Sequence, residues 1–305
     1  MNDRKPGLEH ISVCICTYKR PRLLERLLHK LENQQTGDRF TYSVVVVDND
    51  VSGSAKSVVD AFSARATVPV LYDVEPERGF ALVRNRAVEN ARNTHVAFID
   101  DDEYPNPEWL FCLFRAMNAC NADGVLGPVI PEYQIEPPEW LIKGRLCERE
   151  TFETGTVLED HAQARTGNVL LNRTLFVENP NPFDPRFGKL GGEDGDFFKR
   201  MMSNGKRFVW CNEAPVWEWV PLSRIRRIYF LKRALMRGYL ESKGMHFASY
   251  SILKSSIAVI LYTAALPFFS LMGQHVLMVY LIKDCDHIGK ILGTCGITLF
   301  RERSF

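Results

Sequence analysis

The chain has 305 residues, of which 46% are hydrophobic and 25% are charged. This composition, with 20 glycines and 16 prolines, excludes collagen-like, disordered and low-complexity proteins, and the length suffices for one large domain or two modest ones. The 38 Lys and Arg residues balance 37 Asp and Glu residues, so the net charge of +1 gives no global basic field that would attract a nucleic acid.

The first 125 residues alternate between segments of two kinds. Four segments are apolar and β-favouring, and we expect strands at 11–16, 42–47, 68–72 and 95–99. Apolar residues recur at helical spacing between them, and we expect helices at 21–33, at 81–93 and from about residue 106. This alternation predicts a parallel sheet with a nucleotide-binding site at the carboxyl ends of its strands.

Eight cysteines are spread along the chain, and the amino terminus lacks the basic region and apolar core of a signal peptide. Both features predict a reducing cytoplasm. Cys14 and Cys16 lie in an apolar stretch without the two-residue spacer of a zinc site, so we expect them to be core thiols.

Residues 126–220 are less regular, because prolines between 128 and 138 break any long helix. We expect a strand at 167–171, and after the glycine-rich loop 188–194 a helix that stops at Asn204. An acidic pair, Glu193 and Asp194, therefore stands at the start of that helix.

The composition changes after Pro221, where Lys and Arg residues alternate with large apolar residues. A basic amphipathic segment of this kind commonly lies on an anionic membrane surface. Between Lys254 and Lys283, 28 residues carry no formal charge, which exceeds the roughly 20 residues of a spanning helix. A single span and a re-entrant hairpin that bends near 267–273 fit this pattern equally well. The alternative to membrane attachment is a buried helical hairpin packed on the rest of the chain.

Asp100, Asp101 and Asp102 directly follow the strand expected at 95–99. Adjacent carboxylates repel one another unless a positive group neutralises them, and Mg²⁺ or Mn²⁺ bound together with phosphate oxygens is suited to this. Alternate side chains of an extended segment point the same way, so we expect Asp100 and Asp102 to share a face. The alternative is an acidic turn that caps the next helix.

Four further features are candidates for the same site, each with a structural alternative. Asp48 ends a run of four valines and either accepts hydrogen bonds from a nucleobase or ribose or forms an Asx turn. Arg84 is the cation we expect at the phosphates. Asp194 is either a general base for a hydroxyl or a helix cap. Trp217 and Trp219 form either a sugar-stacking wall or part of the core.

Five motifs now stand in a fixed order along the chain: CTYKRP, VVVVDND, FALVRNRA, AFIDDDEYPNPEWL and GGEDGDFFKRM. Together they resemble the family-2 glycosyltransferases of GT-A fold, and in particular the succinoglycan-type glucosyltransferases of bacterial exopolysaccharide synthesis. The resemblance covers roughly residues 10 to 240. The triple aspartate alone is moderately specific, whereas the five motifs in order are strongly so.

The resemblance implies an α/β, Rossmann-like catalytic domain at 1–220, with a nucleotide-binding half at about 1–125 and an acceptor half at about 126–220. The region 221–305 would then be a membrane-associated extension at the cytoplasmic face of the inner membrane. The implied activity is inverting transfer of a hexose, from a nucleotide-diphosphate donor such as a UDP-sugar, to a lipid-linked or saccharide acceptor.

The resemblance also implies roles for single residues. The donor would be bound by Thr17, Asp48, Arg84, Asp100 and Asp101. Thr17 and Asp48 would contact the base, and Asp100 the ribose or a metal-bound water. Asp102 would ligate Mn²⁺ or Mg²⁺, and Asp194 would be the catalytic base.

Three related classes fit the sequence less well. A sugar nucleotidylyltransferase needs a glycine-rich loop after the first strand, and residues 17–21 contain no glycine. The processive polysaccharide synthases carry a Gln-x-x-Arg-Trp motif and several transmembrane helices, which this sequence lacks, so we expect a single-addition enzyme. A catalytically inactive scaffold of the same fold would not need Asp100, Asp102 and Asp194.

Overall fold

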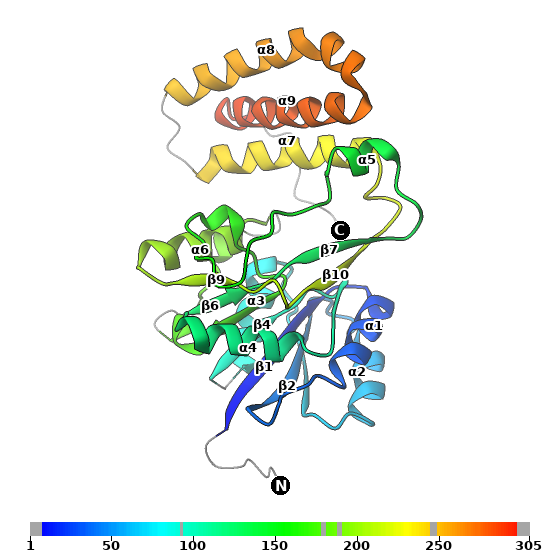
Figure 1. The fold of residues 1–305 in the computed structure, drawn as a ribbon, viewed down its shortest axis with the longest axis vertical. Coiled ribbons are helices and arrows are strands. Elements are labelled where there is room, and N and C mark those ends of the chain that lie inside the picture. Colours follow the sequence, from blue (N-terminus) through cyan, green and yellow to red (C-terminus); the bar gives the residue numbers. More distant parts are fainter. Residues whose placement is uncertain (1–7, 92–93, 178–180, 188–190, 245–248, 298–305) are drawn as a thin grey trace. The chain divides into compact units, whose positions relative to one another are not determined.

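The computed structural model describes residues 8–91, 94–177, 181–187, 191–244 and 249–297 (Figure 1). Contacts within the chain divide it into two compact units. The first consists of Met1–Ile130 and Arg149–Glu218, and the second of Pro131–Glu148 and Trp219–Phe305. The boundary at 218/219 lies close to the predicted one at 220, but Pro131–Glu148 packs with the carboxyl-terminal unit. These two units are defined by packing, whereas the predicted boundary at 220 separates regions by function.

The first unit is built on a seven-stranded sheet of order β3-β2-β1-β4-β8-β6-β9. The four predicted strands are confirmed as β1 (Glu9–Thr17), β2 (Phe40–Asp48), β3 (Val70–Val74) and β4 (His95–Phe98), and they are parallel to one another. The predicted strand near 167–171 is β8 (Val169–Asn172), which runs antiparallel between β4 and β6. The outer strands are β6 (Gly124–Leu126) and β9 (Phe208–Trp210).

Helices cover both faces of this sheet because successive strand residues point to opposite sides. On one side Val13 and Val44 pack in a core with α1 (Pro21–Leu31), α2 (Lys56–Ser63) and α4 (Trp109–Cys120). On the other side Cys14 and Val45 pack with α3 (Phe80–Asn90) and α6 (Glu193–Ser203). Cys14 is fully buried and Cys16 packs partly buried against the same core, as expected, and none of the eight cysteines, all of which lie in the described residues, forms a disulfide.

A second sheet of three strands has the order β5-β10-β7. It consists of β5 (Glu103–Pro105), β10 (Val216–Val220) and β7 (Val129–Tyr133). β10 runs antiparallel to β5 and places Glu218 directly opposite Glu103. Short helical turns complete the connections: α5 (Glu139–Lys143), η1 (His161–Gln163), η2 (Arg173–Phe176) and η3 (Pro185–Phe187).

The second unit consists mainly of three long helices, α7 (Arg227–Gly244), α8 (Ser249–Met272) and α9 (Gln274–Thr294). α9 lies between the other two (Figure 1). The predicted uncharged run divides at Gly273, which has a φ of 121°, so the bend falls at the end of the predicted range 267–273 and Pro267 lies inside α8. Within α8, Ile252–Met272 is long and apolar enough to cross a membrane, and 6% of its apolar window is buried. That low burial argues against the expected alternative of a buried hairpin.

Candidate active site

The carboxyl ends of the central parallel strands bring predicted site residues to one edge of the sheet. β1 and β2 end in register, so that Thr17 lies beside Asp48. An acidic loop, residues 100–102, follows β4, which is the neighbour of β1 on the side opposite β2. The Thr17 hydroxyl donates a hydrogen bond of 2.8 Å to Oδ2 of Asp101 in this loop. Residues separated by more than 80 positions in the sequence therefore meet where the strands end.

Asp48 has a structural role at this edge. Its side chain is fully buried and accepts hydrogen bonds from the backbone amides of Ala55 (2.7 Å) and Asp50 (3.0 Å) and from the hydroxyl of Tyr72 (3.2 Å). These bonds fix the loop after β2, in the manner of the Asx turn given as the alternative. The loop in turn closes one side of the edge.

The three aspartates are arranged differently from the expectation for an extended segment. Residues 101 and 102 form a turn, and one Arg20 nitrogen, Nη1, lies 2.9 Å from Oδ1 of Asp101 and 3.1 Å from Oδ2 of Asp102. Asp100 instead faces Arg84, and its side chain is 48% exposed. The expectation that Asp100 and Asp102 share a face while Asp101 points elsewhere is therefore wrong, because the turn breaks the strand alternation on which it relied.

Arg84 joins the two acidic clusters of the sequence. From α3, its guanidinium forms an ion pair with Glu193 at the start of α6 and lies 4.0 Å from Oδ1 of Asp100. Arg84 is only 12% exposed and the Glu193 side chain 3%, so this ion pair is largely shielded from solvent. The helix that carries Asp194 is thus held next to the acidic loop by a contact spanning 109 residues of sequence.

A third arginine, Arg149, lies among the acids on the side of the small sheet. Arg149 donates a hydrogen bond of 2.7 Å from Nη2 to Oε2 of Glu218, and its Nη1 lies 4.0 Å from Oε1 of Glu103. The two glutamates face each other in the pairing of β5 with β10, where like charges repel unless a cation lies between them. Neither Arg149 nor this role of Glu218 could be predicted from the sequence, because no motif near either residue indicates their contact.

Negative charge outweighs positive charge in the acidic loop. Burial, with Asp102 and Glu218 as further causes, raises the pKa of Asp100 against the lowering effect of Arg84. Burial likewise raises the pKa of Asp101 to about 6, although Arg20 opposes the shift. The pKa of Glu103 is raised well above its usual value by burial and then by Asp100. Such an excess of carboxylates is characteristic of functional sites and favours a bound cation.

The donor set fits a divalent ion that phosphate oxygens help to hold. Among the residues that the structure describes, no group of three or more His, Cys, Asp or Glu side chains forms a complete metal site. Mg²⁺ commonly takes only one or two protein carboxylates together with phosphates and water. The half-exposed Asp100 can supply one such carboxylate, whereas Asp102 is 8% exposed and already pairs with Arg20.

A small cavity adjoins the acids. Its volume is about 210 Å³, and its lining includes Arg149, Arg165, Gly167 and Trp210. A Cβ atom on Gly167 would lie 2.8 Å from Oε1 of Glu103 and 3.1 Å from Oδ2 of Asp100, so only glycine lets the backbone approach the acids this closely. A larger hollow of about 680 Å³ lies at the opposite edge of the sheet, near Glu9 and His95, where β1 and β4 begin. Arg149 and Gly167, which line the smaller cavity, connect it to the acids.

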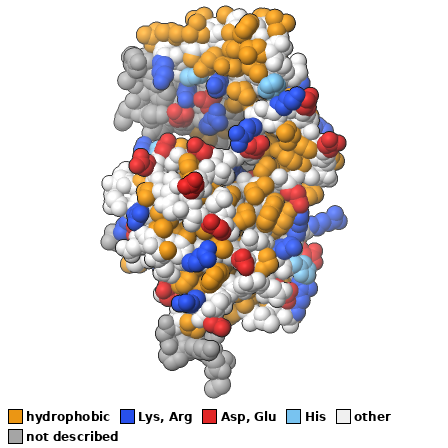
Figure 2. Space-filling view, viewed as in Figure 1, with side chains coloured by type: hydrophobic (Ala, Val, Ile, Leu, Met, Phe, Trp, Pro, Cys, Tyr) orange, Lys and Arg blue, Asp and Glu red, His pale blue; other side chains and the backbone are white. Residues whose placement is uncertain are grey.

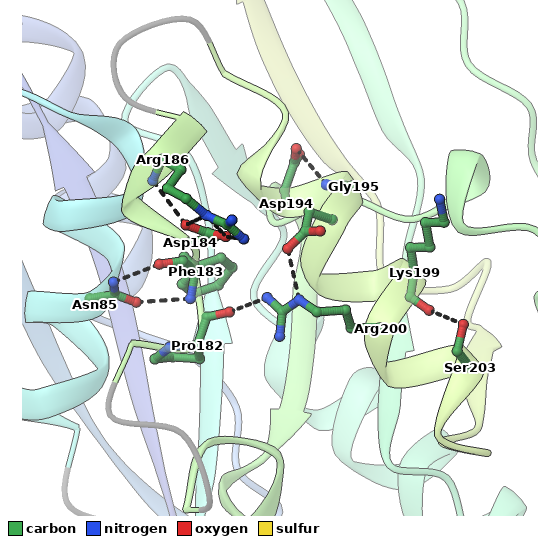
Figure 3. A network of polar contacts seen from close by, with 11 residues as sticks. Asn85, Pro182, Phe183, Asp184, Arg186, Asp194, Gly195, Lys199, Arg200 and Ser203 are labelled. Atoms are coloured by element: carbon green, nitrogen blue, oxygen red, sulfur yellow. Dashed lines mark hydrogen bonds and ion pairs between the residues drawn. The ribbon is translucent and has the colours of Figure 1, made fainter. Parts of the chain in front are cut away.

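The segment before α6 is anchored to its surroundings by the network in Figure 3. The Asn85 side chain exchanges two hydrogen bonds with the backbone of Phe183, at 2.8 and 3.0 Å. Arg200 donates to the carbonyl of Pro182 at 2.5 Å and pairs with Asp196 at 2.7 Å. Asp194 stands in the first turn of α6, partly exposed, and its Oδ1 accepts a hydrogen bond of 2.8 Å from the amide of Gly195.

The predicted tryptophans have packing partners. Trp217 stacks on Tyr104 with ring centroids 6.0 Å apart and an interplanar angle of 21°. The guanidinium carbon of Arg26 lies over the Tyr104 ring, 3.9 Å from its centre. Trp217 is therefore a half-buried member of an aromatic pair on the small sheet.

Comparison with known proteins places the chain among glycosyltransferases. The profile described as "Glycosyl transferase family 2" matches residues 12–178. The succinoglycan biosynthesis protein ExoM of Rhizobium meliloti is 32% identical over 237 residues, which are 77% of this chain and 74% of that protein. Chondroitin synthase of Escherichia coli is 28% identical over 232 residues, but the match covers 33% of its length. The chain thus spans about a third of that synthase.

A solved structure confirms the predicted fold class. The structure of S. aureus TarS 1–349 in complex with UDP superposes with a TM-score of 0.53 at 18% sequence identity, covering 92% of this chain and 89% of that one. At that identity the likeness concerns the fold alone, a mixed α/β, Rossmann-like sheet of GT-A type. Residues 12–178 contain the acidic loop and Arg84 but not α6.

Proposed function

The chain belongs to glycosyl transferase family 2, and from this premise we propose that it transfers a hexose, with inversion, from a UDP-sugar to a lipid-linked or saccharide acceptor. That it is a glycosyltransferase follows from the family, which removes the nucleotidylyltransferase alternative. Its relatives act in polysaccharide synthesis, as the name of ExoM states. The donor, the acceptor and the stereochemistry are the proposal.

The observation that carries the proposal is the position of Arg84 between Asp100 and Glu193. An inverting transfer needs one group of acids at the departing diphosphate and another carboxylate at the incoming hydroxyl, on opposite sides of the anomeric carbon. A single guanidinium in contact with both clusters supports a site of this kind, because it fixes the distance between them. It also offers a cation near the phosphates.

The proposed donor site lies at the carboxyl ends of β1, β2 and β4. Thr17 and the loop held by Asp48 would form the base-binding side, and Asp100 and Asp101 would face the ribose and the ion. The complex of TarS with UDP supports a uridine nucleotide as the donor. Open α/β sheets bind nucleotides at this edge.

Asp102, with Asp100, would hold Mn²⁺ or Mg²⁺. Such an ion, when bound, neutralises negative charge on a departing diphosphate. Arg20 already lies on Asp101 and Asp102, so these carboxylates are oriented in the folded chain. Arg20 and Arg84 would then face the same phosphates from two sides.

Asp194 is the proposed base, which takes the proton from the acceptor hydroxyl as its oxygen attacks the anomeric carbon. The neighbouring Glu193 is less suited to this role, because it is 2% exposed and engaged by Arg84. Asp194 is partly exposed at the start of α6 and is oriented by the Gly195 amide. A single displacement with a base on the far side of the sugar gives inversion.

Attachment to the cytoplasmic face of the plasma membrane completes the proposal. The support comes from α8, which is long and apolar enough for a membrane, and from the basic residues at the start of α7. In this arrangement residues 1–220 hold the nucleotide-binding and acceptor halves, and residues 221–305 attach them to the membrane.

A screen of nucleotide sugars with the full chain and Mn²⁺ or Mg²⁺ tests the proposal. We expect release of free nucleotide diphosphate from one UDP-sugar and a weaker metal-dependent affinity for that donor in Asp102→Asn. Asp60→Asn, at an exposed acid paired with Lys56 on α2, is the control and should match the parent chain. If no donor is hydrolysed with either metal, the inactive-scaffold alternative holds and the proposed activity is wrong.

A further inference from the structure

The described surface of α8 is largely apolar. The helix contains one formal charge, Lys254, and its exposed apolar side chains recur every three or four residues. The exposed fractions of five of them are 58% for Leu253, 48% for Ile257, 61% for Leu261, 61% for Phe268 and 86% for Leu271. Figure 2 shows the hydrophobic surface gathered over this helix. A stripe of this length is larger than soluble monomers ordinarily expose.

The opposite side of α8 packs on α9. Near one end, the hydroxyl of Ser255 lies 3.2 Å from Nδ1 of His287, and further along Thr263 donates 3.0 Å to Oδ2 of Asp284. Towards the other end, the rings of Phe269 and Tyr280 stack with centroids 3.7 Å apart. The two helices are therefore in contact from one end of α8 to the other.

The far side of α9 is tied to α7 by charges and by backbone contact. Asp286 of α9 pairs with Arg237 of α7 at 2.7 Å, and Lys290 of α9 pairs with Glu241 of α7 at 3.0 Å. Gly289 lies against α7, where a Cβ would come 2.2 Å from the carbonyl of Leu235, and Gly238 lies equally close to the carbonyl of Asp286. Helices that meet at glycines and share ion pairs do not separate without losing both contacts.

These contacts are incompatible with α8 as a lone span. If α8 crossed a bilayer, α9 would lie in the hydrocarbon beside it and would bring Asp284, Asp286 and Lys290, with Arg237 of α7 behind them. Charged groups inside a bilayer are strongly unfavourable. If α8 instead lies flat, its apolar stripe meets the acyl chains while α9 and α7 stay on the aqueous side.

We infer that α8 lies in the plane of the bilayer and attaches the protein to one leaflet without crossing it. This inference rests on the membrane attachment in the proposed function, and it replaces both the span and the re-entrant hairpin. A helix attached in this way lies at the boundary of headgroups and acyl chains. Lys254 and the exposed Lys283, at the two ends of the uncharged run, are suited to anionic headgroups.

Depth measurements on nitroxide labels test the inference. Cysteines are introduced singly at Leu253, Leu261 and Leu271 of the full chain, in a Cys295→Ser background whose own labelling is the blank. The protein is bound to vesicles of phosphatidylcholine and phosphatidylglycerol. We expect one shared depth of about 5–10 Å for all three labels. A spanning helix would separate the outer two by about 27 Å along the bilayer normal, with Leu261 near the centre, and that pattern would overturn the inference.

Vesicle binding supplies the matched control. Leu261→Glu with Phe268→Glu should lower the bound fraction at least tenfold, whereas Val177→Glu, at a 72% exposed residue of the first unit, should change it less than twofold. Failure to bind vesicles, together with a dimer in solution that the double variant dissociates, would show that a second copy covers α8 and would overturn the inference. Donor hydrolysis in solution needs no vesicle, so failure here leaves the proposed activity separately testable.

Discussion

Two apolar helices of this chain, α4 and α8, have opposite surroundings. α4 is buried in the first unit, where Trp109, Leu110 and Leu113 are fully enclosed. α8 is twice as long, and most of its apolar side chains are exposed. The composition of a helix shows that it is apolar, and only its length and packing show whether it is buried in protein or faces lipid.

The acidic clusters of the two units differ in how far their negative charge is balanced by basic side chains. Around Asp286 the charges balance, because its carboxylate and that of Glu241 share Arg237 and Lys290. Around the acidic loop six carboxylates face three guanidiniums. A balanced cluster stabilises the fold, whereas an excess of charge implies a ligand that completes it.

The largest effect is expected from Asp194→Asn. Loss of the proposed base should lower the rate of transfer about 10²- to 10⁴-fold, with donor binding nearly unchanged. The rate is measured with saturating UDP-sugar and acceptor, and donor affinity by calorimetry. Asp286→Asn, in the balanced cluster, should affect stability while transfer stays within a few fold. A rate for Asp194→Asn within tenfold of the parent chain, about 1.4 kcal/mol of barrier, would place the base elsewhere.

The next largest effect is a difference in stability between substitutions of a buried and of an exposed aromatic residue. Trp109→Ala removes a fully buried ring and leaves Asn168, its hydrogen-bond partner at 2.7 Å, without that donor. We expect a loss of about 3–5 kcal/mol in the free energy of unfolding. Phe268→Ala, at a 61% exposed ring of α8, should cost less than about 0.5 kcal/mol in solution. Chemical denaturation measures both, and equal losses would refute the assignment of α8 as an exposed surface.

Close packing of α9 on α7 should be sensitive to a single methyl group. Gly289→Ala places a Cβ 2.2 Å from the Leu235 carbonyl, so the helices must move apart, at a cost of about 1–3 kcal/mol. Gly195→Ala is the control, because a Cβ there meets nothing within 4 Å. Thermal unfolding of the two variants should show a lower melting temperature for the first alone. An unchanged melting temperature for Gly289→Ala would mean that these helices are not in backbone contact.

The smallest effect is a dependence of stability on pH through His95, a buried residue of β4. Burial lowers the pKa of His95 below its usual 6.5, although Glu9 opposes the shift. The folded chain therefore favours the neutral ring, and protonation favours unfolding. The free energy of unfolding should fall as the pH decreases from 6.5 towards the folded pKa. His95→Gln should flatten this slope in denaturation curves, and a parallel slope in that variant would assign it to other groups.

Much of the first unit was predictable from local pattern. The strands at 11–16, 42–47 and 95–99 and the helix at 21–33 agree with β1, β2, β4 and α1 within a few residues. The reason is that apolar periodicity, Pro21 at a helix start and polar residues at strand ends act over short distances. The position of the aspartates beyond β4 followed from the same pattern, as did the edge of the sheet at which they lie.

Other features depended on pairings that the local pattern does not encode. β8 runs antiparallel between β4 and β6, and this insertion brings Gly167 against the acidic loop. Arg149 reaches Glu218 across 69 residues, and the turn at 101–102 directs two aspartates towards Arg20. The residues next to a strand or an arginine do not indicate its distant partner, so these contacts could not be predicted from the sequence.

The sequence by itself determined that the chain folds, that its first half forms a parallel sheet with acids beyond the strand ends, and that residues 255–282 avoid charge. Only the tertiary structure decided that Arg84 joins Asp100 to Glu193, and that α9 packs between α7 and the apolar α8. The physical reason is range: propensity and periodicity act within a few residues, whereas ion pairs and helix packing depend on where the whole fold brings distant residues.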